Sequence, residues 1–294
     1  MSFFSPLPHR ALVSVQGVDR FSFLQGMISN DVRHLERGDA MWAAFLTPQG
    51  KFLHEFFAVP HGDAILLECE RDRRTDLITR LSRYRLRAKV TLAPDDTLVV
   101  GVAWGADAAA RLKTTETLGA VTQLGAGTLY TDPRVAGAGV RFALPADHMG
   151  AFLQKLGLQV APESAYDTHR MTLGLPDGSR DLEVEKALLL ENGFAELHGV
   201  DFDKGCYIGQ ELTARTHYRA LIKKRLMPVV IDGEVPAPGA PLTANGADAG
   251  EIRSVSGSRG LALVRLDAWR SGSALESGHA KITPQPPAWM DLSE

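Results

Sequence analysis

The chain has 294 residues, of which 45% are hydrophobic, and its 32 basic and 35 acidic side chains give a formal net charge of −3. This length allows two or three domains with a substantial core. The near balance of charge gives no reason to expect direct nucleic-acid binding. No apolar run approaches the roughly 18 residues of a membrane-spanning helix, so we expect no membrane association. The N-terminus resembles neither a signal peptide nor a transit peptide, so we expect a cytoplasmic protein of bacterial type.

The first part of the chain alternates strand-like and helix-like patterns. A turn at Thr47-Pro48-Gln49-Gly50 separates two apolar runs and predicts that they pair as neighbouring strands. Asp19 precedes a helical spacing of apolar residues and is suited to an N-cap. The alanine- and glycine-rich segment 105–127 predicts a helix followed by a mobile loop. Strands are predicted over 11–15, 41–46, 52–59, 63–68, 98–104 and 127–130, and helices over 19–25, 73–86, 147–156 and 164–173.

The pattern changes after Arg225. A strand-like run over 226–231 is followed by turn signals such as Asn245-Gly246 and Ser256-Gly257 at short intervals. Short strands separated by frequent turns predict a small antiparallel β-barrel. We therefore expect an α+β protein with two regions. Residues 1–224 would form two subdomains that need not be continuous in sequence, and residues 225–294 the barrel, with a binding cleft near their junction.

Only two cysteines occur, Cys69 and Cys206. Cys69 ends an apolar, strand-like run, which predicts a buried core thiol. So few cysteines, without a secretion signal, argue against a disulfide framework. Cubane iron–sulfur clusters are generally held by four thiolates. A cluster on this protein would therefore have to share ligands with a partner or use ligands other than cysteine.

Cys206 lies in a polar segment punctuated by glycines, which is unusual for a structural cysteine. Glycines allow tight turns and close approach to the sulfur. Lys204 and Arg215 are cations that would favour the reactive thiolate, although pairing with Asp203 and Glu211 is the alternative. Three roles remain open for Cys206. It is a metal or cluster ligand, a nucleophile with His217 as the nearest histidine in sequence, or a structural loop residue.

Residues 204–211 read Lys-Gly-Cys-Tyr-Ile-Gly-Gln-Glu, which resembles the signature of the YgfZ-like family. Residues 212–217 and 223–226 are most similar to the branch of that family containing the mitochondrial late-acting iron–sulfur assembly factor. Weaker similarity extends over 24–32, 47–51, 180–182 and 191–192. The resemblance implies an aminomethyltransferase (folate-binding) type α+β fold with the C-terminal barrel. It also implies a tetrahydrofolate cofactor and an A-type iron–sulfur carrier protein as partner.

The same resemblance assigns residues to a site. Asn30 and Asp31 would line the folate-type cavity, although both also suit a plain turn. Glu55 matches a catalytic aspartate of the glycine-cleavage T-protein, and a carboxylate in an apolar strand suits acid–base chemistry. Its alternative is an outward-facing position on a half-exposed strand. Tyr207, Gln210 and Glu211 are expected to contact the cofactor. The alternative is that Tyr207 only packs and that Gln210 and Glu211 only hold the loop through hydrogen bonds.

Two further features bear on folate. Thr172 occupies the position that in the T-protein carries a pterin-binding glutamate, so methylene transfer as in that enzyme is not expected. Arg80, Arg83 and Arg87 are predicted to share one helical face within the basic run 80–89. Such a face is usually solvated, but it would also suit the anionic glutamate tail of a folate.

These features favour a non-catalytic maturation factor that helps to deliver 4Fe–4S clusters to client enzymes. Cys206 would bind a transient cluster shared with the A-type carrier. The main alternative is a folate-dependent one-carbon transferase that uses Glu55 as its acid or base. A third hypothesis is an accessory protein of tRNA modification, acting through an iron–sulfur enzyme.

Overall fold

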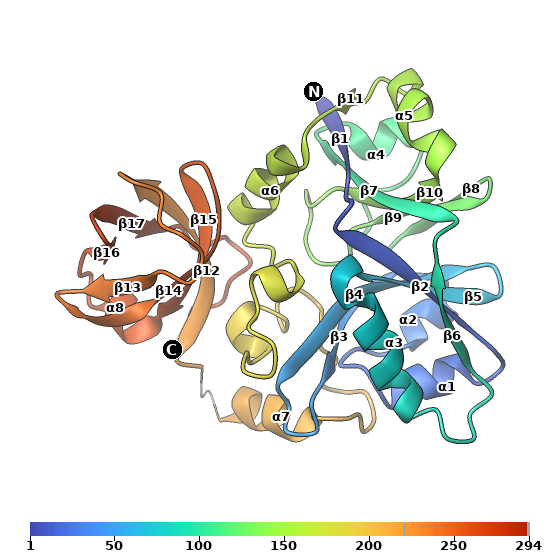
Figure 1. Ribbon diagram of the computed structural model, residues 1–294, viewed down its shortest axis with the longest axis horizontal. Coiled ribbons are helices and arrows are strands. Elements are labelled where there is room, and N and C mark those ends of the chain that lie inside the picture. Colours follow the sequence, from blue (N-terminus) through green and yellow to red (C-terminus); the bar gives the residue numbers. More distant parts are fainter. Residues whose placement is uncertain (220–221, 293–294) are drawn as a thin grey trace.

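The computed structural model describes residues 1–219 and 222–292. Two mixed regions of sheet and helix lie side by side, and a barrel lies beside them, with helix α6 (Glu163–Thr172) between the barrel and one sheet (Figure 1). Within the described residues, no helix is both long and apolar enough to cross a bilayer. The α+β class and the C-terminal barrel are confirmed.

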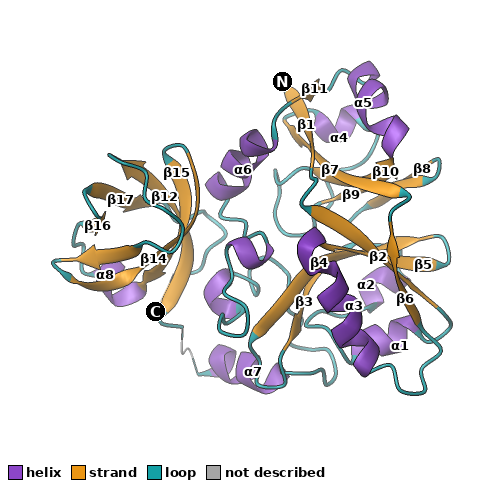
Figure 2. Cartoon of the chain, in the orientation of Figure 1, coloured by secondary structure: helices purple, strands orange, loops and turns teal. Residues whose placement is uncertain are grey.

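The five-stranded antiparallel sheet is built from the first half of the chain (Figure 2). One face of the sheet carries Val13, Phe45 and Leu67 and packs on three helices. The opposite face carries Leu12 and Phe57 and packs on other parts of residues 1–224. Both faces are therefore buried. In sheet order the strands are β3 (Met41–Leu46), β4 (Phe52–His61), β5 (Ala64–Glu70), β2 (Arg10–Gln16) and β6 (Thr91–Asp95), and the helices are α1 (Arg20–Gln25), α2 (Arg33–Glu36) and α3 (Arg74–Arg83).

The predicted strands and turn of this sheet are confirmed, but two helical predictions need correction. Asp19 precedes α1 without a side-chain cap, because its carboxylate accepts the backbone N–H of Lys89 instead. Helix α3 ends at Arg83, and Leu86 adopts a left-handed backbone with φ +44°. Arg87 therefore does not share a helical face with Arg80 and Arg83.

The six-stranded sheet combines the N-terminus with residues 98–160. Strands β7, β9 and helix α5 match the predictions, whereas β1, β8, β10 and β11 were not predicted. The segment 105–127 holds only the short helix α4 (Ala108–Arg111) and β8. In sheet order the strands are β11 (Gln159–Val160), β1 (Ser2–Pro6), β7 (Leu98–Gly105), β10 (Val140–Pro145), β9 (Gly127–Thr131) and β8 (Val121–Leu124), with α5 (Ala146–Lys155) beside them.

The C-terminal strands close into a six-stranded barrel around apolar residues that include Met227, Leu242, Ile252 and Val264. Closure leaves no unpaired sheet edge. In barrel order the strands are β12 (Lys224–Asp232), β15 (Arg259–Arg265), β14 (Ala247–Ser256), β13 (Pro241–Ala244), β16 (Leu275–Ser277) and β17 (Ala280–Pro284), and α8 (Leu266–Arg270) follows β15.

A connecting segment, residues 173–209, joins α6 to helix α7 (Gln210–Tyr218) and contacts the barrel region at several places. The Ser254 hydroxyl donates to the Asp181 carboxylate at 2.5 Å. The Trp289 indole N–H, beyond the last barrel strand, donates to the Leu173 carbonyl at 2.8 Å. Gly174 and Gly193 leave room for the Trp289 ring, because a Cβ at either position would come within 3.0 Å of it. The barrel is thus anchored to the segment that leads to α7.

Candidate functional site

The loop that carries Cys206 has an exposed sulfur and a well-defined backbone. Cys206 is exposed, while Cys69 is buried, as predicted. The Asp201 carboxylate accepts the backbone N–H groups of Asp203 and Lys204 at 2.8 and 2.9 Å. The Gln210 side-chain oxygen accepts the N–H of Tyr207 at 3.1 Å. Short-range hydrogen bonds on both sides of Cys206 therefore fix the loop that presents the sulfur.

Lys204 ties this loop to a distant part of the chain. Its buried ammonium donates to the carbonyl oxygens of Gln25, Ile28 and Asn30 at 2.9, 2.6 and 2.8 Å, and it lies 4.9 Å from the centre of the Tyr207 ring. Burial lowers the pKa of Lys204 to about 8. Its three N–H donors serve backbone carbonyls, so the surface pairing considered from the sequence is not its role. An effect of its charge on Cys206 stays a prediction.

The start of α7 rests on the turn between β3 and β4. Gly209 and Gly50 have φ values of +80° and +79°, in the left-handed region that favours glycine. A Cβ at Gly209 would lie 2.4 Å from the Thr47 carbonyl oxygen, and one at Gly50 would lie 2.7 Å from the Gly209 oxygen and 2.6 Å from Leu212. The two segments touch through bare backbone, which explains the glycine at each position.

The remaining signature side chains lie along α7. Glu211 and Arg215 are exposed, so both are accessible to a partner. The ring of His217 stacks on Phe202 with centroids 3.9 Å apart and an interplanar angle of 14°. No hydrogen bond within the described chain joins His217 to Cys206. The structure therefore gives no support to a Cys206 nucleophile with His217 as its base.

Asn30 and Asp31 are buried in a tight turn. The Asn30 amide donates to the carbonyls of Trp42 and His198, both at 2.8 Å, and its oxygen accepts the N–H of Asp31. The Asp31 carboxylate accepts the backbone N–H of Arg33 at 2.9 Å and its guanidinium at 2.6 Å. Burial alone would raise the pKa of Asp31, but these hydrogen bonds outweigh it and hold the pKa below its usual value.

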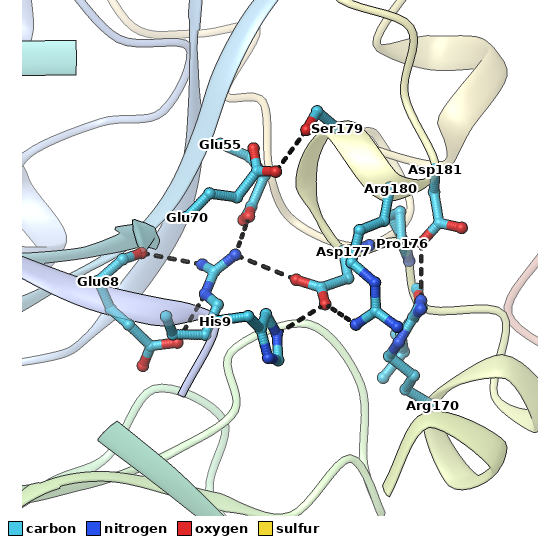
Figure 3. Close-up of polar contacts among 12 residues, drawn as sticks. His9, Glu55, Glu68, Glu70, Arg170, Pro176, Asp177, Ser179, Arg180 and Asp181 are labelled. Atoms are coloured by element: carbon cyan, nitrogen blue, oxygen red, sulfur yellow. Dashed lines mark hydrogen bonds and ion pairs between the residues drawn. The ribbon is translucent and has the colours of Figure 1, made fainter. Parts of the chain in front are cut away.

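Glu55 does not face outward from a half-exposed strand. Its side chain is 1% exposed, because β4 is covered on both faces. One carboxylate oxygen pairs with Arg10 at 2.5 Å and the other accepts the indole N–H of Trp42 at 2.7 Å. Figure 3 shows Glu55, Glu68 and Asp177 around a single guanidinium group. Their hydrogen bonds identify this group as that of Arg10. The outward interpretation of Glu55 is wrong.

This ion-pair network also links the two sheets. Glu68, on β5, accepts hydrogen bonds from Tyr130 on β9 and from Arg141 on β10. Burial alone would raise the pKa of Glu68, but the nearby charges of Arg141 and Arg10 hold it below its usual value. Arg10, Glu68 and Arg141 could not be recognised as a group from local patterns, because each is only a single charge within an apolar strand.

Several of the residues linked to folate chemistry by resemblance make their hydrogen bonds within the protein. The polar atoms of Asn30, Asp31 and Glu55 are engaged by protein groups. Thr172 is exposed on α6, and its hydroxyl donates to the Thr168 carbonyl at 2.8 Å. Gln210 supports the loop at Tyr207. No folate-dependent step follows from these contacts.

Comparison with known proteins places this architecture in a class. The fold matches the glycine cleavage system aminomethyltransferase T from Bartonella henselae with a TM-score of 0.79 and 15% identity, over 98% of this chain and 86% of that chain. The model of the CAF17 C-terminal β-barrel domain matches residues 223–292. The molecule is thus an aminomethyltransferase-like α+β protein with a CAF17-type barrel.

Sequence relatives then define the family. The chain is 35% identical to the mitochondrial iron–sulfur cluster assembly factor IBA57 of Mus musculus, over 96% of this chain and 84% of that protein. It is 36% identical to the Homo sapiens protein of that name, over 88% and 76%, and 32% identical to the Pyricularia oryzae homologue, over 98% and 80%. The chain belongs to the IBA57 family of iron–sulfur cluster assembly factors, as the resemblance predicted.

Proposed function

We propose that this protein is a maturation factor that helps to deliver 4Fe–4S clusters to client enzymes, and that Cys206 supplies one thiolate to a cluster held jointly with an A-type carrier. The observation that carries the proposal is the contrast between the two cysteines. Cys206 is exposed on a fixed loop, whereas Cys69 is 1% exposed and burial raises its pKa to about 12. One thiol is therefore available to a partner.

The surroundings of Cys206 suit a shared ligand. A Cβ at Gly205 would meet no atom within 4 Å, so a second protein can approach the backbone beside the sulfur. Cubane clusters generally need four thiolates, and this chain offers one accessible sulfur, so the partner would supply the others. When Cys206 binds iron, an Fe–S bond forms and the thiol proton leaves to solvent.

The alternatives receive less support. A one-carbon transferase would need a free carboxylate, but Glu55 is paired with Arg10 and Trp42. Tetrahydrofolate therefore has no step in this proposal. A contribution to tRNA modification would be indirect, because it would pass through an iron–sulfur client enzyme that modifies tRNA.

The test is anaerobic cluster reconstitution. The reduced protein is mixed with an A-type carrier, ferrous iron and sulfide, and the complex is followed by visible absorption and circular dichroism. We expect a heteromeric cluster spectrum that disappears in Cys206→Ser and persists in the matched control Cys69→Ser. The same spectrum from Cys206→Ser, or a carrier that forms no complex with the wild-type protein, would contradict the proposal.

A further inference from the structure

A second candidate site lies at the same β3–β4 turn that contacts the start of α7. A cavity of about 440 Å³ opens between this turn and the C-terminal end of α3. Such a volume lies within the usual range for small-molecule sites, about 300–1,000 Å³. Its walls include the cations Lys51, Arg80 and Arg83 and the apolar side chains Phe45 and Leu53.

Two of the three cations form no salt bridge within the described residues. Arg80 is committed, because its Nε donates to both Asp76 oxygens at 2.9 Å and its Nη2 donates to Glu185 at 3.3 Å. By contrast, the side chains of Lys51 and Arg83 form no ion pair or hydrogen bond within the described residues, although the charge of Lys51 also acts on Glu191. Both therefore remain free to meet an anion in the cavity.

The cavity also offers a flat apolar wall. Tyr84 lies edge-on to Phe45, with centroids 6.1 Å apart and an interplanar angle of 83°. Phe45 is buried, but Tyr84 is 37% exposed, so part of its ring faces the outside of the helix end. Aromatic rings pair favourably with other flat rings in offset or edge-to-face arrangements. Tyr84 and Leu53 thus provide a place for a planar group beside the two free cations.

We propose that this cavity binds an anion carried on a flat ring, with Lys51 and Arg83 contacting the anionic group and Tyr84 the ring. Two sources share this chemistry, a nucleoside phosphate and an aromatic carboxylate. Planar, bidentate recognition of phosphate or carboxylate favours arginine over lysine. We therefore expect Arg83 to contribute more than Lys51.

The position of the cavity connects it to Cys206. The turn residues Thr47, Pro48 and Gln49 form one wall of the cavity. The Thr47 carbonyl faces Gly209, three residues after Cys206. The contact is between backbones without an intervening side chain, so a ligand that shifts the turn also shifts the Cys206 loop. Occupancy should therefore change the rate at which Cys206 is alkylated.

A purely structural role for Arg83 is the competing explanation, since cations in the last turn of a helix stabilise it by about 0.3–1 kcal/mol. Binding measurements separate the two. Isothermal titration calorimetry with the full chain would use three probes: AMP, 4-hydroxybenzoate and inorganic phosphate. The variants are Arg83→Gln, Lys51→Gln and Tyr84→Leu. Arg87→Gln is the matched control, because Arg87 is exposed beyond the end of α3 and does not line the cavity.

We expect one of the two ring-bearing probes to bind more tightly than phosphate, and its identity assigns the source. Arg83→Gln should raise the Kd of that probe at least about fivefold, Lys51→Gln and Tyr84→Leu at least about twofold, and Arg87→Gln less than about twofold. At a probe concentration near the wild-type Kd, the probe should change the rate of iodoacetamide alkylation of Cys206 more in the wild type than in Arg83→Gln. Equal Kd values for the wild type and Arg83→Gln, phosphate binding as tight as that of both ring-bearing probes, or no saturation at about 10 mM of any probe would overturn the proposal.

Discussion

Arg10 and Glu55 form a buried ion pair although β5 lies between their two strands. The long arginine side chain reaches across the sheet, and the second Glu55 oxygen is taken by the Trp42 indole. Removing one partner of a buried ion pair destabilises a protein by more than the pair contributes to its stability, because the other charge is left without a partner in the interior. Glu55, which matches a catalytic aspartate of the T-protein, therefore serves to stabilise the fold.

This arrangement predicts that Glu55→Gln reduces stability rather than abolishing a reaction. Removing the negative charge leaves Arg10 less compensated and should lower the free energy of unfolding by about 3 kcal/mol. Urea unfolding followed by circular dichroism measures the change, with the exposed Glu276→Gln as control. If Glu55→Gln is as stable as Glu276→Gln, the pair does not stabilise the fold.

A second prediction concerns pH and His54. Burial and the charge of Arg73 lower the pKa of His54 to about 4, while its Nε2 hydrogen bonds to Asp76 at 2.9 Å. Between the ordinary histidine pKa and this value, the unfolded chain binds a proton that the folded chain does not. Stability should therefore fall by about 3 kcal/mol as pH drops from about 6.5 to about 4 through this group.

His54→Gln keeps an N–H donor for Asp76 but cannot take up the proton. The difference in unfolding free energy between wild type and variant should therefore shrink as pH falls through this window. The exposed His279→Gln should show the wild-type profile. Parallel pH profiles for wild type and His54→Gln would show that His54 is not the group responsible.

Replacement of Gly209 tests the contact below the Cys206 loop. Gly209 and Gly246 both have left-handed backbone, with φ +80° and +79°, but a Cβ at Gly246 meets nothing within 4 Å. Gly246→Ala should cost only the conformational strain of about 1–2 kcal/mol. Gly209→Ala adds a clash with the Thr47 carbonyl and should cost about 1–3 kcal/mol more. Urea unfolding compares the two, and hydrogen exchange should show increased exchange of residues 204–209 only in Gly209→Ala.

The two cysteines should differ in reactivity by a large factor. With a pKa of about 12, the Cys69 thiol is almost entirely protonated at pH 8, and it is also buried. Iodoacetamide reacts with the thiolate. Mass spectrometry of the native protein should therefore find one label, at Cys206, and two labels after unfolding in urea. Comparable labelling of Cys69 in the native protein would refute the assignment of Cys206 as the accessible thiol.

Much of the secondary structure could be predicted from the sequence, because turns and apolar runs are local signals. The turn over 47–50 and the flanking apolar runs specify the β3–β4 hairpin, and frequent turn pairs after Arg225 specify the barrel strands. Strand β1 was missed because its five residues include Pro6 and carry no clear alternation. Strand β11 has only two residues and depends on its parallel partner, β1.

The site was predicted less completely, for two physical reasons. Glu55 could not be oriented from alternation, because β4 is buried on both faces and its pattern is almost continuous. Lys204 binds carbonyls 174 to 179 residues earlier in the chain, and no local pattern reports such a contact. The identity of the loop around Cys206 came from the signature, but its attachment points came only from the fold.

The Trp289 contact bears on how the chain matures during synthesis. Leu173 and Gly193 precede the barrel, yet their packing is completed by a residue that follows its last strand. The segment that leads to Cys206 therefore cannot reach its final packing until Trp289 has left the ribosome. During translation, the stretch from Leu173 to Gly193 is therefore made before the barrel but completes its packing only after the last barrel strand has been made.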